Sequence, residues 1–378
     1  MNYSFSMRPI NKFNGPKLSL KFPKEIACFS YDDEHQFRLD DSSIKYYYTP
    51  SLGADLCEGF EHFQKLEDTG DEHLESLLKT LINLEQKTGQ KVEANFITWR
   101  GMMTKLMGAI YDNFDGFEMN ATIFQVVSFI EENYTYKLQT KHDQLEIPTP
   151  RGRHSQEMMS YWGYKFETLS LLPKPWNETT RDYIETRKNL IVNNKAQYCS
   201  VVQTELNGST MILGGEIDGV WDMKQNDGMP VNWIELKTCA EARNERDLDK
   251  LDRKLMKFYI QSYLLGVPKV IVGYRTSDGI LVNVEEFKTL MIPSIVMKRK
   301  HLWDANICLT FLDSLLKFLR TIMTNELQNV SVDDAPMWRI RRKKQESAIE
   351  VFRVEGNARS ILSSEFVSWR LELASKQN

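Results

Sequence analysis

Three neighbouring segments in the middle of the chain carry the strongest strand signals in the sequence. They cover residues 199–206, 210–218 and 233–238, and the first two are separated by Asn207-Gly208. Asn-Gly is a favoured pair for the two-residue turn of a β-hairpin, so these two segments are predicted to pair antiparallel. A second turn-rich stretch, 225–230, precedes the third segment. This arrangement predicts a sheet, in which 210–218 and 233–238 are neighbouring strands if the turn over 225–230 joins them directly.

Charged side chains interrupt these apolar strands in a regular way. Alternate residues of a strand point to the same face, so Glu216 shares a face with Asp218, and Glu235 shares one with Lys237. If the strands are neighbours, three carboxylates and one lysine converge, because cross-strand partners lie roughly 5 Å apart. Unpaired charge is costly in apolar strands. Each pattern alone also occurs on ordinary solvated strands, but the two together favour a functional site.

The predicted site suits a divalent metal ion and phosphate chemistry. Mg²⁺ and Mn²⁺ prefer hard oxygen ligands such as carboxylates. An ion of this kind can polarise a phosphoryl oxygen and lower the pKa of a bound water. Lys237 could steady the attacking water or the negative charge that develops. We therefore expect a phosphodiesterase with Mg²⁺ or Mn²⁺ as its cofactor.

The rest of the sequence predicts one large mixed α/β domain over 26–378, after an irregular segment over 1–25 that contains three prolines. The hydrophobic periodicity and the cap residues predict helices over 71–87, 102–110, from 155, over about 178–190, 246–265, 302–325 and about 357–373. Further strands are predicted over 26–31, 45–48, 94–99, 269–274, 336–342 and 347–355. The stretch 117–138 predicts a strand pair with its turn at 131–133, and 139–154 predicts an exposed loop.

Several classes of protein do not fit this composition. The chain has five scattered cysteines and six scattered histidines without a recognisable ligand spacing, so a disulfide framework or a zinc site is not expected. It has no apolar run of the roughly 20 residues that span a bilayer and no signal peptide, so we expect a soluble, intracellular protein. Its net charge is −4, so any RNA bound must meet cations gathered around one centre.

Five short motifs occur in order along the chain. They are Thr98-Trp99-Arg100-Gly101, Gly163-Tyr164-Lys165-Phe166-Glu167, Glu216-Ile217-Asp218, Glu235-Leu236-Lys237 and the segment 257–266 around Gln261. Together they resemble the motifs of the eukaryotic DXO family of RNA 5′-end decapping and pyrophosphohydrolase enzymes, within the PD-(D/E)xK nuclease superfamily. The resemblance covers about 24–290 and, more weakly, the C-terminal SSEFVSWRLEL. One departure is Tyr259, where the family often has Trp.

The resemblance implies a fold and a set of site residues. The fold would be a single domain with two twisted mixed β-sheets, flanked by helices, around a PD-(D/E)xK-like core. The implied metal ligands are Glu216, Asp218, Glu235, the carbonyl of Leu236 and, through water or a second ion, Glu167. Lys237 and Gln261 would contact the scissile phosphate and the nucleophile, and Arg100 would hold RNA phosphates, which a guanidinium binds well. The catalytic residues would then be Glu167, Glu216, Asp218, Glu235, Lys237 and Gln261.

The expected function is hydrolysis of triphosphate or incompletely capped RNA 5′ ends, with 5′→3′ exonuclease activity left open. The fungal members that the chain resembles most also imply a nuclear 5′→3′ exoribonuclease as partner, and therefore nuclear rather than cytoplasmic residence. The first alternative is a binding protein that mainly stabilises this exoribonuclease; the second is a DNA endonuclease, which fits the central motif but not the other four.

Two basic stretches have weaker interpretations. The loop residues Arg151, Arg153 and His154 could line the RNA path or be solvated. The run Arg339–Lys344 could serve nuclear import or bind nucleic acid, or its charges could protect an edge strand.

Overall fold

The computed structural model describes residues 2–67, 70–146, 154–224, 230–325 and 335–377. Within them the strands form two mixed sheets of ten and six strands, which confirms the predicted fold class. The large sheet contains, in spatial order, β1 (Asn2–Ser6), β16 (Ala348–Asn357), β15 (Pro336–Arg342), β6 (Phe117–Phe124), β7 (Val127–Glu132), β5 (Phe96–Trp99), β10 (Ser209–Ile217), β9 (Gln197–Leu206), β2 (Lys24–Tyr31) and β3 (Phe37–Arg38). The small sheet contains β14 (Leu281–Lys288), β13 (Lys269–Arg275), β12 (Trp233–Ala240), β11 (Gly219–Val220), β4 (Tyr46–Tyr47) and β8 (Leu171–Leu172).

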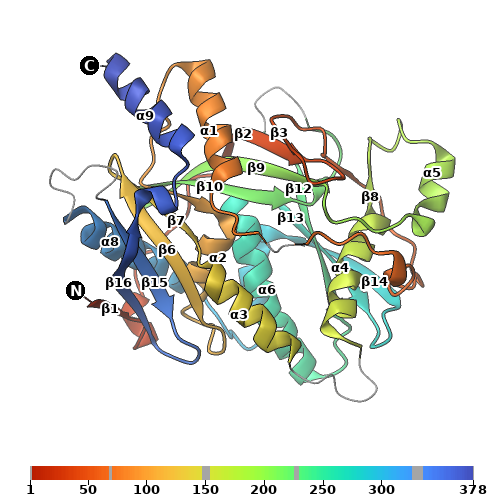
Figure 1. Cartoon of the computed structure of the whole chain (residues 1–378). Coiled ribbons are helices and arrows are strands. Elements are labelled where there is room, and N and C mark those ends of the chain that lie inside the picture. The colour runs from red at the N-terminus through yellow and green to blue at the C-terminus, as the bar shows by residue number, and fades with distance from the viewer. Residues whose placement is uncertain (1, 68–69, 147–153, 225–229, 326–334, 378) are drawn as a thin grey trace.

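Helices cover both sheets and join them (Figure 1). They are α1 (Glu75–Thr88), α2 (Arg100–Gly108), α3 (Tyr134–Leu145), α4 (Gln156–Ser170), α5 (Arg181–Thr186), α6 (Glu245–Leu265), α7 (Ile292–Met297), α8 (Ala305–Asn325) and α9 (Ser364–Gln377). On the large sheet, α1 packs on β2 and α9 packs on α1, while α2 and α8 pack on β10. On the small sheet, α4 packs on β12. Helix α6 contacts β9 and β10 of the large sheet and β13 of the small one, so it spans the junction.

Local signals account for most of these elements. The Asn207-Gly208 turn joins β9 and β10 as an antiparallel pair, with both turn residues at positive φ. Helix α4 begins after Ser155, whose side chain accepts a hydrogen bond from the Met158 amide. Helix α6 ends at Gly266 in the left-handed conformation. No helix in the described part of the chain is long and apolar enough to cross a membrane.

Some predicted boundaries were wrong. Strands β6 and β7 do pair, but they turn at Gln125 and Val126, not at 131–133. Asn133 instead caps α3, since its side chain accepts a hydrogen bond from the Tyr136 amide, so 134–145 is helical where strand and loop were predicted. The helix predicted over about 178–190 is reduced to α5 and a 3₁₀ turn over Arg187–Asn189.

The chain ends also differ from the prediction. The N-terminal segment is not irregular throughout, because β1 pairs antiparallel with β16 at the end of the large sheet. Near the C-terminus, a 3₁₀ turn (Ala358–Ser360) precedes α9, which therefore begins later than predicted. Strand β1 was missed because it depends on a partner, β16, that is distant in sequence.

The basic run Arg339–Lys344 lies in or just after an interior strand, because β15 pairs with β16 on one side and β6 on the other. The edge-strand interpretation was therefore wrong. Arg339 pairs with Glu118 at 2.6 Å, and Arg342 is buried, donating to backbone carbonyls. Arg339 and Arg342 therefore serve the fold, whereas Lys343 and Lys344 are exposed.

Candidate active site

The chain passes from the large sheet to the small sheet at the acidic motif. Strand β10 ends at Ile217 and β11 begins at Gly219, so Asp218 lies at the crossing. Two glycines permit this close passage. A Cβ on Gly215 would lie 2.7 Å from Leu265 Cδ1, and one on Gly219 would lie 2.7 Å from Leu171 Cδ2. Larger residues there would push the acidic strand away from its neighbours.

The predicted neighbour relation of the two motif-bearing strands was wrong in detail. Strand β10 lies in the large sheet and β12 in the small one, and it is the short β11 that pairs with β12. Asp218 still reaches the second motif, because its Oδ2 accepts a hydrogen bond of 2.6 Å from the Leu236 amide. Glu216 is opposite Cys199 in the large sheet. The acidic groups therefore meet across the sheet junction rather than across one strand pair.

Glu235 is a buried carboxylate with two cations beside it. Its residue is 1% exposed, and its Oε1 lies 2.6 Å from Lys237 Nζ and 3.5 Å from Arg100 Nη1. Arg100 comes from the start of α2, just after β5, and Glu235 and Lys237 come from β12, so two elements supply this cluster. A buried carboxylate is tolerable when cations of this kind surround it.

Glu167 and Gln261 approach from two helices. Glu167 lies half-buried on α4, the helix that packs on β12. Its charge interacts with those of Asp218 and Glu216, which places it at the same centre. Gln261 lies half-buried on α6 and lines a cavity of about 280 Å³ beside Gly101. Among the described residues no hydrogen bond joins Gln261 to the acidic groups, so it flanks the centre.

Burial and like charge make the carboxylates of this centre hard to ionise. Burial raises the pKa of Glu167 well above its ordinary value, and the charges of Asp218 and Glu216 raise it further. Burial, followed by the charge of Glu235, raises the pKa of Asp218 to about 7. Desolvation also raises the pKa of Glu216, but its side chain is exposed, so water screens the effect.

Glu235 and Lys237 behave in the opposite way. Burial alone would raise the pKa of Glu235, but the charges of Lys237 and Arg100 outweigh it and lower the pKa. Burial would lower the pKa of Lys237, but Glu235 and Asp218 outweigh it and raise the pKa. The structure therefore keeps Glu235 ionised and Lys237 protonated near neutral pH.

The donor set fits a hard divalent cation. Glu235 Oε2 is buried and has no hydrogen-bond partner among the described residues, which is costly unless an ion meets it. Asp218 and Glu167 are carboxylates whose ionisation a cation would favour. Within the described part of the chain, no three His, Cys, Asp or Glu side chains are already gathered closely enough to hold a metal ion.

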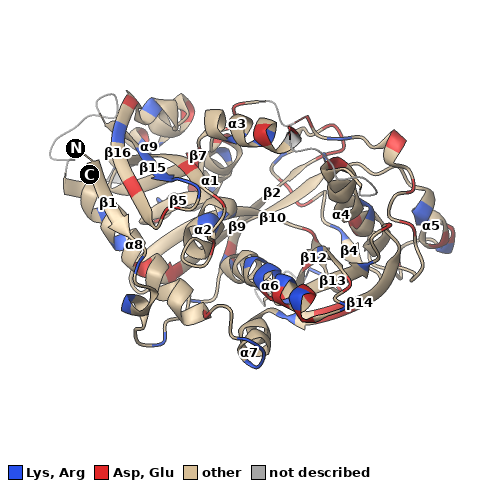
Figure 2. Cartoon of the chain, turned by 90° about the horizontal axis from the view of Figure 1, so that it is seen from below, with Lys and Arg blue, Asp and Glu red and all other residues tan. Residues whose placement is uncertain are grey.

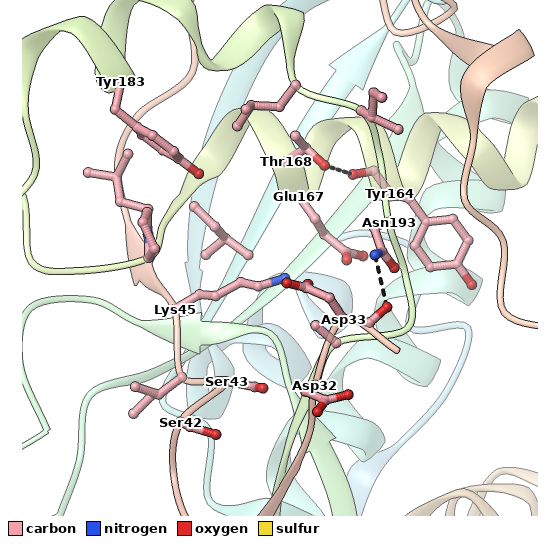
Figure 3. A pocket seen from close by; sticks show the side chains of 17 residues that line it. Asp32, Asp33, Ser42, Ser43, Lys45, Tyr164, Glu167, Thr168, Tyr183 and Asn193 are labelled. Atoms are coloured by element: carbon pink, nitrogen blue, oxygen red, sulfur yellow. Dashed lines mark hydrogen bonds between the residues drawn. The ribbon is translucent and has the colours of Figure 1, made fainter. Parts of the chain in front are cut away.

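Two cavities meet at Glu167. The larger, of about 520 Å³, is lined by Glu167, Lys45, Asp33 and Tyr183 among others (Figure 3). Figure 3 shows Glu167 and Lys45 projecting into it from different elements. The other, of about 380 Å³, is lined by Glu167, Leu236 and Lys237 and by residues of α6. Because Glu167 lines both cavities, the acidic centre borders each of them.

Comparison with known proteins decides the family. The model of the RAI1 like PD-(D/E)XK nuclease family matches residues 21–367. The chain belongs to this family. The resemblance to the eukaryotic RNA 5′-end decapping enzymes is thereby confirmed.

Curated and solved members of this nuclease family match nearly the whole chain. A protein named decapping nuclease RAI1 from Gibberella zeae is 53% identical over 374 residues, covering 98% of this chain and 97% of that protein. One of the same name from Aspergillus fumigatus is 50% identical, covering 97% and 98%. The crystal structure of Candida albicans Rai1 in complex with pU5 and Mn²⁺ has a TM-score of 0.87 at 27% identity, covering 99% and 100%. Scheffersomyces stipitis Rai1, in complex with (3′-NADP)⁺ and a calcium ion, has a TM-score of 0.86 at 29% identity, covering 98% and 100%.

One charged residue beside the acidic centre was missed from the sequence. Lys45 lines the larger cavity, and its charge lowers the pKa of both Glu167 and Glu216. Its backbone carbonyl accepts a hydrogen bond from Val220, which fixes it beside the sheet crossing. A single lysine before three tyrosines gives no sequence signal of this role. Of the predicted RNA-path residues, Arg151 and Arg153 lie outside the described residues, and the ring of His154 packs edge-on against Trp162.

Proposed function

We propose that this chain is a divalent-metal-dependent hydrolase of RNA 5′ ends, acting on triphosphate or incompletely capped RNA in 5′-end quality control. One observation carries the proposal: Glu167, Asp218, Glu235 and Lys237 come together from three elements beside two cavities. Relatives that are about half identical over nearly the full length are decapping nucleases by name, which supports the same activity here.

We propose that Mg²⁺ or Mn²⁺ is held by Glu216, Asp218, Glu235 and the Leu236 carbonyl, with Glu167 beside them. When bound, the ion supplies Lewis-acid polarisation of the phosphate and a more acidic water. The solved relatives with Mn²⁺ and with calcium support a divalent ion. The unpartnered Glu235 Oε2 is the strongest local support in this chain.

The chain's own residues would orient and stabilise the substrate. Lys237, kept protonated by Glu235, would act as a cation toward the phosphorane-like charge and not as a base. Arg100, whose Nη1 lies 3.5 Å from Glu235 Oε1, would hold a phosphate with its guanidinium group, which suits phosphate oxygens. Gln261 would contact the scissile phosphate from α6. Attack of water at the α-phosphorus then breaks the bond to the departing pyrophosphate or cap-bearing group and leaves a 5′-monophosphate on the RNA.

The alternative of a non-catalytic binding protein is less favoured. A protein that had lost catalysis would be expected to lose at least one of the acidic, lysine or glutamine residues, and all are present. We nevertheless propose that a nuclear 5′→3′ exoribonuclease is a partner, and that the protein resides in the nucleus. These two proposals rest on the family resemblance. Co-purification with the exoribonuclease and imaging of a fluorescent fusion would test them.

The activity can be tested directly. Purified protein would be incubated with 5′-triphosphate RNA or unmethylated-capped RNA, in Mg²⁺, Mn²⁺ or EDTA. We expect a 5′-end product in either metal and none in EDTA, and the product's identity will show whether pyrophosphate or a capped nucleotide leaves. Folded protein that releases nothing from either RNA would contradict the proposal and favour the binding role.

A further inference from the structure

We propose that one face of α6 is a binding track for the RNA nucleotides that follow the reacting 5′ end. This inference rests on the proposed function, because it concerns the same substrate. The track consists of Lys250, Lys254 and Lys257 and leads to Gln261 at the active centre. Spacings of four, three and four residues put all four on one helix face. At 1.5 Å per residue they extend over about 16 Å, the length of a few nucleotides.

Continuity with the active centre carries the assignment. Three adjoining cavities share members of the track, one after another. Gln261 and Lys257 line the cavity of about 280 Å³. Lys257 and Lys254 line the cavity of about 380 Å³ that contains Glu167 and Lys237. Lys254 and Lys250 line a third cavity, of about 250 Å³. A strand whose 5′ phosphate reaches Lys237 can therefore continue along this face.

The charges of the track fit a phosphate backbone. Lys254 is exposed and pairs with no carboxylate among the described residues. Lys257 pairs with Asp115 at 3.2 Å and with the less exposed Asp112 at 3.4 Å, and Lys250 pairs with Asp247 at 3.0 Å, but both lysines are themselves exposed. Exposed ion pairs are weak, so a phosphate can replace the carboxylate as partner.

The surroundings add further cations and one aromatic surface. Arg243 and Arg275 line the third cavity, together with the acidic Glu241 and Asp247. Tyr164 and Phe258 line the middle cavity, where an RNA base could stack on an aromatic ring. Figure 2 shows the Lys and Arg segments that repeat along α6 with Asp and Glu segments between them. In a chain of net charge −4, positive charge beside the acidic centre is the feature that RNA binding requires.

Salt dependence of binding tests the track without relying on catalysis. Binding of a 20-nucleotide 5′-triphosphate RNA would be measured in EDTA over a range of salt, for the wild type and for Lys250→Gln/Lys254→Gln. Each lost phosphate contact of a single strand lowers the slope of log K against log salt by about 0.7. The slope should therefore be smaller by about 1.4 in the double variant. Lys254→Glu should weaken binding more than Lys254→Gln does, because it also introduces a negative charge. Lys87→Gln, an exposed lysine on α1, is the matched control and should keep the wild-type slope.

The length of the RNA distinguishes a track from a general effect. Affinity for the 20-nucleotide RNA should fall more than affinity for a 5′-triphosphate dinucleotide, which cannot reach the far lysines. A wild-type slope in the folded double variant, or equal losses for both RNAs, would overturn the proposal. Hydrolysis of the dinucleotide by the wild type tests the proposed function separately, so failure of the activity and failure of the track give different results.

Discussion

Replacing Asp218 by Asn should stabilise the metal-free protein while it removes activity. Asp218 has a pKa of about 7, because burial and the charges of Glu235 and Glu216 oppose its ionisation. Its unfolded value is 3.8. A carboxyl whose folded pKa is raised contributes stability below pH 3.8 that is lost as pH rises to about 7. At pH 8 the ionised Asp218 therefore destabilises the fold, and an amide of the same shape does not.

The magnitude follows from the two pKa values. Their difference is about three pH units, or about 4 kcal/mol at 1.36 kcal/mol per unit, as an upper limit. Asn can still accept the hydrogen bond that the Leu236 amide donates to Asp218. The unfolding entropy of 378 residues is about 0.8 kcal/mol/K at ordinary values per residue. The variant should therefore melt up to about 5 °C higher at pH 8 in EDTA, and the gain should disappear near pH 4.

Thermal unfolding in EDTA at pH 8, 6 and 4 measures this difference. Asp278→Asn, an exposed carboxylate away from the centre, is the control and should leave the melting temperature unchanged at each pH. Mn²⁺ at 100 times its dissociation constant should stabilise the wild type by about 2.7 kcal/mol and Asp218→Asn by less. A variant that melts at or below the wild-type temperature in EDTA at pH 8 would refute the electrostatic account of the centre.

Three further changes test other parts of the structure. Lys45→Met removes a charge that lowers the pKa of two carboxylates of the centre, so the acidic limb of the kcat/KM profile should move to higher pH, and an unmoved limb would count against its role. Gly273→Ala would place a Cβ 2.6 Å from Phe166, which lies on the helix that supports the centre. It should lower the free energy of unfolding, measured in urea, by about 1–3 kcal/mol. An unchanged free energy of unfolding would show that the helix can shift without cost. Arg370→Met breaks the buried pair with Glu85, at 2.6 Å, and should cost about 3–5 kcal/mol by the same measurement, whereas a loss below 1 kcal/mol would contradict burial of the pair.

Local sequence signals predicted the acidic centre but not the way its strands meet. The hairpin at Asn207-Gly208 and the apolar strands that carry Glu216 and Glu235 are short-range features, and they are present in the structure. Which sheet a strand joins depends on distant partners, so the crossing at Asp218 could not be predicted. The same reason explains why β15 was taken for an edge strand.

Single residues from distant elements were beyond pattern reasoning. Arg100, Glu167 and Gln261 were identified through the family resemblance, since one Arg, one Glu and one Gln on helices have many ordinary roles. Lys45 was missed even then, because only the folded chain brings it to the cavity beside Glu167. The specific roles of these residues remain predictions, which substitution of each can test.

The most direct test of the account is the rate at which wild type and Glu235→Gln release the 5′-end product from triphosphate RNA in Mn²⁺. Gln keeps the size of the side chain but removes the charge that holds Lys237 and Arg100 and faces the metal site. The account predicts metal-dependent release by the wild type and a loss of at least about 100-fold in the variant, the effect of removing one preorganised electrostatic group. Equal rates for the two proteins, or full wild-type activity in EDTA, would contradict it.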